Sequence, residues 1–401
     1  QLNKASVHSS GDNYSTFTGR SAATRASQGR CTFAIYEGTS DYGEIIICDG
    51  VNEPLLFQMT GTGGLTTRTF FVKEIIVSGT TGPAVGVIHD KHLVVAGAPT
   101  AKNTIYYSGT NDIDSFSSSG SGSVVISDAV VGLASFRSDL IIFCKNSIHK
   151  LSNINDANSI SVTPITTNVG CVNGGSIQEV GGDIMFLAPD GLRLLSATDR
   201  IGDFGLGVVS KNIQDDLVTF ISTNTNFTSC VVREKSQYRI FGYNNNITQE
   251  NAQGILGTQF SGQGGEGMAW GELRGIRAYV ADSRFYQNVE TIVFANDDGY
   301  LYQMEDGNSF DNSNIQTTFA TPFMPINDPR VRKTFYKSFL YTDPQGSVSF
   351  DMSLKLDFDQ RNSIQPTQIN FDNDTGEVAF YGSASYFKAG QASSVYSSKL
   401  V

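Results

Sequence analysis

The stretch Asp183–Leu195, DIMFLAPDGLRLL, decides the fold of this chain. It contains two short apolar segments separated by Ala188-Pro189-Asp190-Gly191. The Asp-Gly pair supplies the positive-φ backbone that a tight antiparallel connection requires, so the stretch predicts a β-hairpin.

Similar apolar runs recur along most of the chain. They begin at residues 44 to 54 positions apart: Ile45, Leu93, Leu140, Ile184, Tyr238 and Ile292. This spacing is close to the ~40 to 50 residues of a four-stranded propeller blade and is too long for most helical solenoid repeats. We therefore predict an all-β protein, a β-propeller of about six four-stranded blades.

The pattern divides the chain into three parts. Residues 31–307 are assigned to the propeller, residues 1–30 to an N-terminal arm, and residues 308–401 to a smaller C-terminal β platform and tail. In the platform, Ser347–Phe358 alternates polar and apolar residues, which predicts a half-buried strand, paired with Phe335–Tyr341. Both ends are rich in Ser, Thr, Ala and Gly and are expected to be extended arms. Because the chain lacks an initiator Met, it is expected to be processed or incomplete at its start.

One stretch has helical periodicity. Its apolar residues follow i, i+4, i+7 and i+8 spacing at Ile213, Leu217, Phe220 and Ile221. Ser210 is available as the N-cap. We expect one short helix that decorates the propeller between two blades.

Composition excludes several classes of protein. With 39% hydrophobic residues the chain is too apolar to be disordered, and runs such as Leu140–Cys144 are too short to span a bilayer. Its 28 basic and 39 acidic residues give a net charge of -11, which argues against sequence-independent binding to nucleic acid. The five cysteines lack metal-binding spacing and are expected to be reduced core residues.

Possible cofactor and metal motifs have simpler interpretations. Gly262–Gly267 matches the pattern G-x-G-x-x-G, but a dinucleotide site needs a helix after this motif, and the residues that follow are interrupted by glycines. The segment is therefore expected to be a flexible loop. His89 and His92 flank Asp90 in a predicted hairpin turn and are expected to point into solvent.

The acidic turns do not predict a calcium site or a catalytic site either. Asp372–Glu377 begins like a calcium loop, but Ser383 occupies its twelfth position, so a plain turn is favoured. Thr39–Gly43 and Ala295–Gly299 resemble the Asp-box turns of sialidase propellers, which are architectural. No catalytic, cofactor-binding or metal-binding residue is predicted.

Three stretches resemble successive blades of a known group of proteins: Ser138–Leu151, Gly170–Ile177 and Gly182–Leu195. The upstream segment Asn103–Asp112 is similar to the segment that precedes those blades, although Tyr107 stands where the family often has Trp. The group is the tail nozzle, tail tubular or packaged-DNA-stabilisation β-propeller family of short-tailed bacteriophages. The resemblance covers about residues 85 to 300, with a weaker likeness at Asp328–Lys333.

The resemblance implies a structural virion protein of the phage tail without enzymatic activity or cofactor. Its six-bladed subunits would form an oligomeric ring, usually a hexamer, that extends the portal-adaptor DNA channel at the head-tail connection. The ring would retain the packaged genome and conduct it during ejection. Implied partners are the portal-adaptor ring, tail fibre or tailspike proteins, and packaged double-stranded DNA without sequence-specific contact; no membrane is implied.

Two other functions remain open at this stage. A glycan-binding, lectin-like propeller is motivated by aromatic residues expected in loops, namely Trp270, Tyr286 and Tyr300. A sialidase-like glycosidase is motivated by the Asp-box-like turns, and its carboxylates could come from separate blades.

Overall fold

A computed structural model of the chain describes residues 30–38, 43–60, 69–196, 208–262, 265–297 and 300–306, with short segments at 318–321, 323–325, 328, 331, 349–356 and 369–372. The chain divides into two units, residues 1–317 and 318–401. The boundary predicted from the sequence, after residue 307, lies ten residues before this division. Residues 1–29 of the predicted arm, the segment Phe335–Tyr341 and the turn after Asp372 lie outside the described residues.

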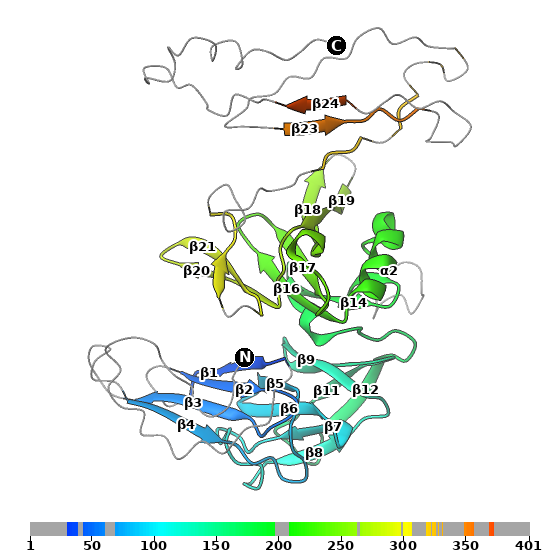
Figure 1. Cartoon of the computed structure of the whole chain (residues 1–401). Helices are drawn as coiled ribbons and strands as arrows, with labels where there is room; N and C mark the ends of the chain where they lie inside the picture. The colour runs from blue at the N-terminus through cyan, green and yellow to red at the C-terminus, as the bar shows by residue number, and fades with distance from the viewer. Residues whose placement is uncertain are drawn as a thin grey trace. The chain divides into compact units, whose positions relative to one another are not determined.

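The first unit consists of six antiparallel sheets in chain order, called here blades 1 to 6 (Figure 1). Blade 1 contains β1 (Thr32–Tyr36), β2 (Glu44–Cys48), β3 (Leu55–Thr60) and β4 (Thr69–Glu74); blade 2 contains β5 (Val85–His89), β6 (His92–Ala98), β7 (Ala101–Tyr107) and β8 (Gly122–Val125); blade 3 contains β9 (Val130–Phe136), β10 (Asp139–Cys144), β11 (Ile148–Ser152) and β12 (Ser161–Thr166). Blade 4 contains β13 (Gln178–Val180), β14 (Asp183–Ala188) and β15 (Gly191–Leu194); blade 5 contains β16 (Asn226–Val232), β17 (Gln237–Tyr243), β18 (Gln253–Gly262) and β19 (Gly265–Arg274); blade 6 contains β20 (Val280–Tyr286), β21 (Val289–Ala295) and β22 (Leu301–Gln303).

Successive blades are arranged around a common centre. The first strand of one blade lies beside the first strand of the next: β1 beside β5, β5 beside β9, β13 beside β16, and β16 beside β20. Within each blade, neighbouring strands are joined in sequence order. The fold is therefore a β-propeller, as the sequence predicts.

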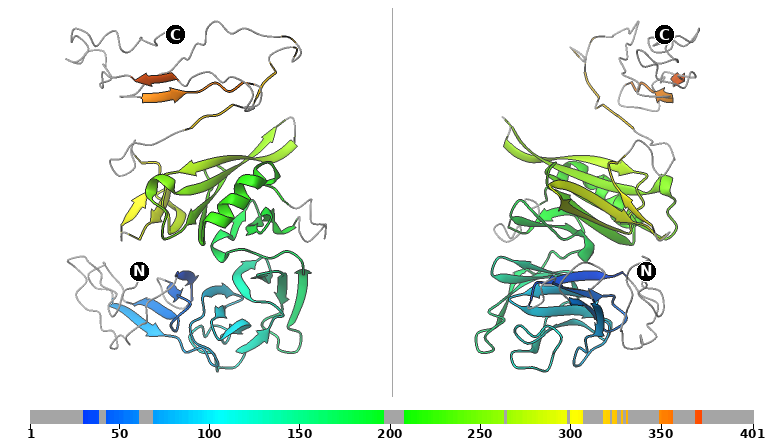
Figure 2. Two further views of the ribbon diagram at one scale, coloured as in Figure 1. Left: turned by 45° about the vertical axis from the view of Figure 1, so that its right-hand side comes forward. Right: turned by 90° about the vertical axis from the view of Figure 1, so that its left-hand side faces the viewer.

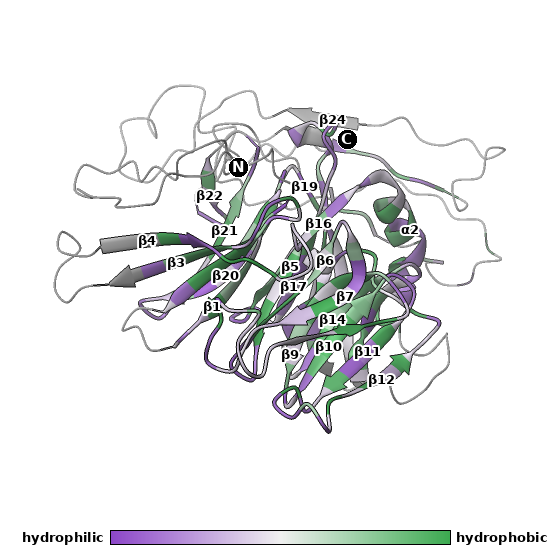
Figure 3. Ribbon diagram, turned by 90° about the horizontal axis from the view of Figure 1, so that it is seen from below, coloured by the Kyte–Doolittle hydropathy of each residue, from purple (hydrophilic) through white to green (hydrophobic). Residues whose placement is uncertain are grey.

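The six apolar runs that predict the propeller all form the second strand of a blade: β2, β6, β10, β14, β17 and β21. In blades 2 to 5 the second strand is packed on both faces, because its two sides point toward the preceding and the following blade, and its residues belong to two different cores. In β10, Leu140 and Ile142 belong to the core shared with blade 2, whereas Ile141 and Phe143 belong to the core shared with blade 4. Burial on both faces explains why these strands are continuously apolar instead of alternating. Figure 3 shows apolar residues along β10 and β11.

Two blades have fewer strands than the four predicted. Blades 4 and 6 have three strands each among the described residues. At the outer edge of blade 4, Val208 forms an isolated antiparallel bridge with Arg193. The expected flexible loop at Gly262–Gly267 is wrong in part, because Gly262 pairs with Gly265 and the pairing continues along β18 and β19. The glycine-rich segment is therefore the end of a long hairpin.

The predicted helix is confirmed as α2 (Gln214–Thr223), which follows the short 3-10 helix η3 (Lys211–Ile213). Its buried residues, Leu217 and Phe220, pack into the core between blades 4 and 5. The predicted cap is wrong. The Ser210 hydroxyl makes no cap hydrogen bond and instead accepts the backbone N–H of Leu192 at 2.9 Å. Ser210 therefore fastens the entry to the helix onto β15.

The second unit contains one antiparallel strand pair in its described part, β23 (Ser349–Met352) with β24 (Ile369–Asp372). The strand predicted over Ser347–Phe358 is shorter than expected, since the ladder stops at Met352 and residues 353–356 are not in a strand. Two further short 3-10 helices lie in the first unit: η2 (Gly174–Ser176) and η4 (Gln249–Asn251). Within the described residues, no helix has the length and hydrophobicity needed to cross a membrane.

Candidate functional site

His89 and His92 do not point into solvent, so that expectation is wrong. The exposed fractions are 2% for His89 and 0% for His92, because the His89 ring packs toward Ser135 of blade 3 and the His92 ring toward Ser108 in the segment after β7, while the turn residues between them are exposed. His92 Nδ1 lies 2.5 Å from Ser108 O, and its Nε2 lies 2.9 Å from Asn155 Oδ1. Both ring nitrogens of His92 therefore have oxygen partners within the protein.

His89 lies in an arrangement that superficially suggests a catalytic triad. Its Nδ1 is 2.8 Å from Ser135 Oγ, and its Nε2 is 3.9 Å from Asp90 Oδ2. The second distance is too long for a hydrogen bond, so the carboxylate does not orient the imidazole as a general base requires. Burial lowers the pKa of His89, and Asp90 and Asp139 oppose this effect.

A second Ser-His-Asp group consists of Ser147 in the β10–β11 turn, His149 in β11 and Asp128 in the segment between β8 and β9. Ser147 Oγ is 3.0 Å from His149 Nε2, but it also donates to Asp128 Oδ2 at 3.2 Å. Asp128 further accepts the backbone N–H of Asn146 at 2.6 Å and that of Ala129 at 2.7 Å. The carboxylate therefore holds the turn in place and is not available to orient His149.

Asp128 makes the stability of this turn dependent on pH. Burial raises the pKa of Asp128, but the hydrogen bonds from Asn146, Ala129 and Ser147 outweigh it and lower the pKa overall. A carboxyl whose folded pKa lies below its unfolded value stabilises the protein above the unfolded pKa of about 4, and that contribution is lost as the pH falls through the folded pKa.

Acidification is therefore expected to lower the free energy of unfolding as the pH falls below the unfolded carboxyl pKa of about 4 and through the lower folded pKa of Asp128. Urea unfolding at a series of pH values measures this, and Asp128→Asn is expected to flatten the dependence. Equal stability of the native chain at both ends of this series would contradict the expectation.

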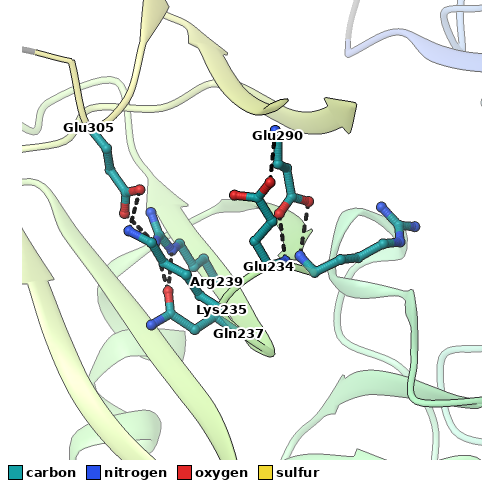
Figure 4. A network of polar contacts seen from close by, with 7 residues as sticks. Glu234, Lys235, Gln237, Arg239, Glu290 and Glu305 are labelled. Carbon is teal, nitrogen blue, oxygen red and sulfur yellow. Dashed lines mark hydrogen bonds and ion pairs between the residues drawn. The ribbon is translucent and has the colours of Figure 1, made fainter. Parts of the chain in front are cut away.

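A charged cluster joins blades 5 and 6 (Figure 4). Glu290 of β21 accepts the backbone N–H groups of Arg233 at 2.9 Å and Glu234 at 2.8 Å, both from the β16–β17 turn. Its carboxylate also accepts the Ser283 hydroxyl at 2.7 Å. Burial raises the pKa of Glu290, and these hydrogen bonds outweigh it, so the pKa is lowered overall. Glu290 thus ties the β16–β17 turn to blade 6.

The second half of this cluster is centred on Glu305, just after β22. Arg239 Nη2 lies 2.5 Å from Glu305 Oε1, and Lys235 Nζ lies 2.6 Å from Glu305 Oε2. Arg239 is only 5% exposed and also donates to Gln237 Oε1. Because the carboxylates of Glu290 and Glu305 and the cations of Lys235 and Arg239 all have hydrogen-bonding or ionic partners, the cluster is suited to holding two blades together.

One Asp-box-like turn contributes to the same junction from another side. Asp297 accepts both Nη atoms of Arg277, at 2.7 and 2.9 Å, and the hydroxyl of Tyr243 at 3.0 Å. Asp298 and Gly299 of that turn, and Thr39–Tyr42 of the other, lie outside the described residues. The described part of the turn is architectural, because Asp297 is engaged by blade 5 and by the segment before β20.

The aromatic residues expected in loops have different environments. Trp270 is in β19, is half-buried in the core between blades 4 and 5, and donates its indole N–H to Val209 O at 3.2 Å. Its assignment to a loop is wrong. Tyr286 is the last residue of β20, so its assignment to a loop is also wrong. Tyr286 and Tyr300 are exposed, at 70% and 69%.

Replacing Trp270 with alanine is therefore expected to lower the free energy of unfolding by about 1–2 kcal/mol, because it removes packed surface and a hydrogen bond. Urea unfolding measures the loss, with the exposed Tyr300→Ala as a matched control expected to be nearly neutral. An unchanged Trp270→Ala variant would contradict its structural role.

The described residues contain no group of three or more His, Cys, Asp or Glu side chains that could hold a metal ion. The five cysteines are free thiols; Cys48, Cys144, Cys171 and Cys230 are buried as expected for core residues, whereas Cys31 is only partly buried, so the expectation is wrong for that residue. Burial raises the pKa of Cys48, Cys144 and Cys230 to about 12. Such thiols remain protonated near neutral pH and are poor nucleophiles.

Sequence reasoning assigned no role to the residues of the junction between blades 5 and 6. Glu290 and Glu305 carry no local motif, and the blade 5 residues that they contact lie more than fifty residues away in sequence. Asp297 was the one residue of this junction that the sequence analysis had singled out, because it belongs to an Asp-box-like turn.

The geometry defines a β-propeller whose polar clusters mainly join turns and blades. No family model matches the chain, and no curated protein matches it. Among solved structures, the chain is similar to the N-terminal domain of Nup159, with a TM-score of 0.36 at 12% identity, covering 68% of this chain and 74% of that chain. It is also similar to Hsv2 of Kluyvelomyces marxianus, with a TM-score of 0.38 at 11% identity, covering 72% and 79%. These similarities carry no information about activity, ligands or partners.

Proposed function

We propose that this chain is a structural virion protein of a bacteriophage tail, of the nozzle type. Copies of the chain form a ring, usually of six, which extends the portal-adaptor channel, retains the packaged genome and conducts it during ejection. The chain contacts the adaptor ring and tail fibre or tailspike proteins, and it performs no catalysis.

The observation that carries the proposal is the location of the three phage-like stretches. They form the β10–β11 hairpin, the segment leading into η2, and the β14–β15 hairpin. All three stretches contribute apolar residues to the core between blades 3 and 4, among them Phe143, Cys171 and Phe186, and the two hairpins also contribute to the cores on either side of it. The resemblance therefore follows a continuous structural unit of two adjoining blades, which supports a shared blade architecture.

The charge of the chain also supports a conduit. The net charge of -11 disfavours binding to phosphates, and a DNA channel must let the duplex pass without holding it. Several acids have structural partners, as Asp128, Glu290 and Glu305 illustrate. Rigid blades with paired charges suit a channel wall.

The proposal is tested by electron microscopy of the full chain mixed with a portal-adaptor ring, and by antibody labelling of intact particles. A ring of copies with a central channel, and label at the tail vertex, are expected. Label absent from virions, or a chain that binds a glycan array or hydrolyses a panel of chromogenic glycosides, would overturn the proposal in favour of a glycan-directed propeller.

A further inference from the structure

Two buried histidines link blade 2 to blade 3. His89 and His92 are cross-strand partners where β5 ends and β6 begins. The Nδ1 atom of His89 lies 2.8 Å from Ser135 Oγ in β9, and the Nε2 atom of His92 lies 2.9 Å from Asn155 Oδ1 in the segment after β11. Blades 2 and 3 lie side by side along β5, β6 and β9 (Figures 1 and 2). Both hydrogen bonds therefore cross the boundary between these two blades.

The two imidazoles differ in how they can accommodate a second proton. Each ring nitrogen of His92 lies within hydrogen-bonding distance of an oxygen atom. The Nε2 atom of His89, in contrast, is buried and has no hydrogen-bond partner among the residues that the structure describes. The Asp90 carboxylate, at 3.9 Å, is too distant to accept its proton. Because both nitrogens of an imidazolium carry a hydrogen, protonation of His89 in this position creates a buried positive charge with an unsatisfied donor.

The ionisable groups that act on His89 come from three places in the fold. Asp90 in the β5–β6 turn and Asp139 at the start of β10 favour the protonated imidazole, whereas His92 in β6 disfavours it. The Asp90 side chain is 47% exposed, and Asp139 already has Lys150 as an ionic partner at 3.5 Å. Neither carboxylate therefore compensates for the loss of hydration. Burial is the largest effect, and the pKa of His89 is lowered.

The lowered pKa of His89 sets the direction of the response to pH. With the boundary closed, His89 is neutral, and once the ring reaches solvent its pKa returns to about 6.5. The open form then binds protons more readily than the closed form, so a fall in pH below about 6.5 favours opening. This range lies well above the one in which Asp128 loses its charge.

We propose that His89 is a pH-sensitive link between blades 2 and 3. Neutral His89 is hydrogen-bonded to Ser135 and holds the β5–β6 turn against β9. In mildly acidic solution the imidazole takes up a proton from solvent, turns outward toward Asp90 and releases Ser135. The boundary between blades 2 and 3 then opens, while the other inter-blade cores stay packed. This inference concerns the single chain and does not depend on the proposed function.

Three native thiols report where the molecule opens. Cys144 is buried in the core shared by blades 2 and 3, Cys171 in the core between blades 3 and 4, and Cys230 in the core between blades 5 and 6. Labelling of the full chain with N-ethylmaleimide is followed at each thiol by mass spectrometry. Each rate is divided by the rate of the same thiol in the urea-unfolded chain at the same pH, which removes the effect of thiolate fraction.

The corrected labelling rate of Cys144 is expected to rise several-fold between about pH 7.5 and about pH 5.5, where a free imidazole becomes protonated. The corrected rates of Cys171 and Cys230 are expected to stay unchanged. His89→Gln keeps a hydrogen-bonding group but does not titrate, so the rise at Cys144 is expected to disappear in this variant.

His149→Gln is the matched control. His149 is also a buried histidine, but its hydrogen bond to Ser147 stays within blade 3, so this variant is expected to keep the pH-dependent rise. Ser135→Ala covers the case in which His89→Gln does not fold. It removes the hydroxyl and keeps the imidazole, and it is expected to accelerate labelling of Cys144 already at neutral pH.

Three results would overturn the proposal. The first is a Cys144 rate that does not change with pH in the native chain. The second is the same rise in His89→Gln as in the native chain, since another group would then be responsible. The third is an equal rise at all three thiols, which would mean that acid loosens the whole propeller and not the boundary between blades 2 and 3.

Discussion

Replacing Phe186 with alanine is expected to lower the free energy of unfolding by about 3–5 kcal/mol, because a fully buried aromatic side chain is lost and a cavity remains. Phe186 is 0% exposed, and its ring centroid lies 5.2 Å from that of Phe143. The two rings come from neighbouring blades, β14 and β10, so the substitution weakens the contact between blades 3 and 4. Urea unfolding followed by far-UV circular dichroism measures the change.

Phe260 provides the matched control for this prediction. It lies on β18 but is 49% exposed, so Phe260→Ala removes the same side chain from a partly solvated position. Its effect is expected to stay below about 1 kcal/mol. Similar losses for the two variants would mean that the core between blades 3 and 4 is not packed as described.

Replacing Arg239 with alanine is expected to lower the free energy of unfolding by about 2–3 kcal/mol. Arg239 is almost fully buried and is hydrogen-bonded to Gln237 and Glu305. Its removal leaves the Glu305 carboxylate with one cation, Lys235, instead of two among the contacts described above. The estimate is below the full value for a buried ion pair because the Glu305 side chain is 37% exposed and remains partly hydrated.

The surface pair Arg274–Glu272 is the control for the charged junction. Its side chains are 57% and 48% exposed, and the Nε–Oε1 distance is 3.0 Å. Arg274→Ala is expected to change stability by less than about 1 kcal/mol, because exposed ion pairs are offset by side-chain entropy and solvent screening. If both variants unfold at the same urea concentration as the native chain, the junction does not hold blades 5 and 6 together.

The propeller rests on the repeated second strands and is present in the structure. The tail-nozzle function rests on three stretches in two adjoining blades and stays a proposal. A fold can be inferred from repetition alone, whereas a function needs a site or an assembly that repetition does not specify.

The amino-acid sequence by itself determined the all-β class, the positions of the second strands, the hairpin Asp183–Leu195 and the helix near Leu217. These features depend on local patterns, namely apolar runs, turn residues and helical spacing, and each can be read within a few residues. The sequence also indicated that the thiols would be buried, because the cysteines lie within apolar runs.

Only the tertiary structure decided that His89, His92 and Trp270 are buried or half-buried, because local sequence patterns predict these residues in turns or loops. Their burial depends on segments from other strands and blades, such as Asn155 beside His92 and Val209 beside Trp270. The same is true of Glu305, whose partner Arg239 is 66 residues away in sequence. Such contacts depend on the register and packing of whole blades, which no local pattern contains.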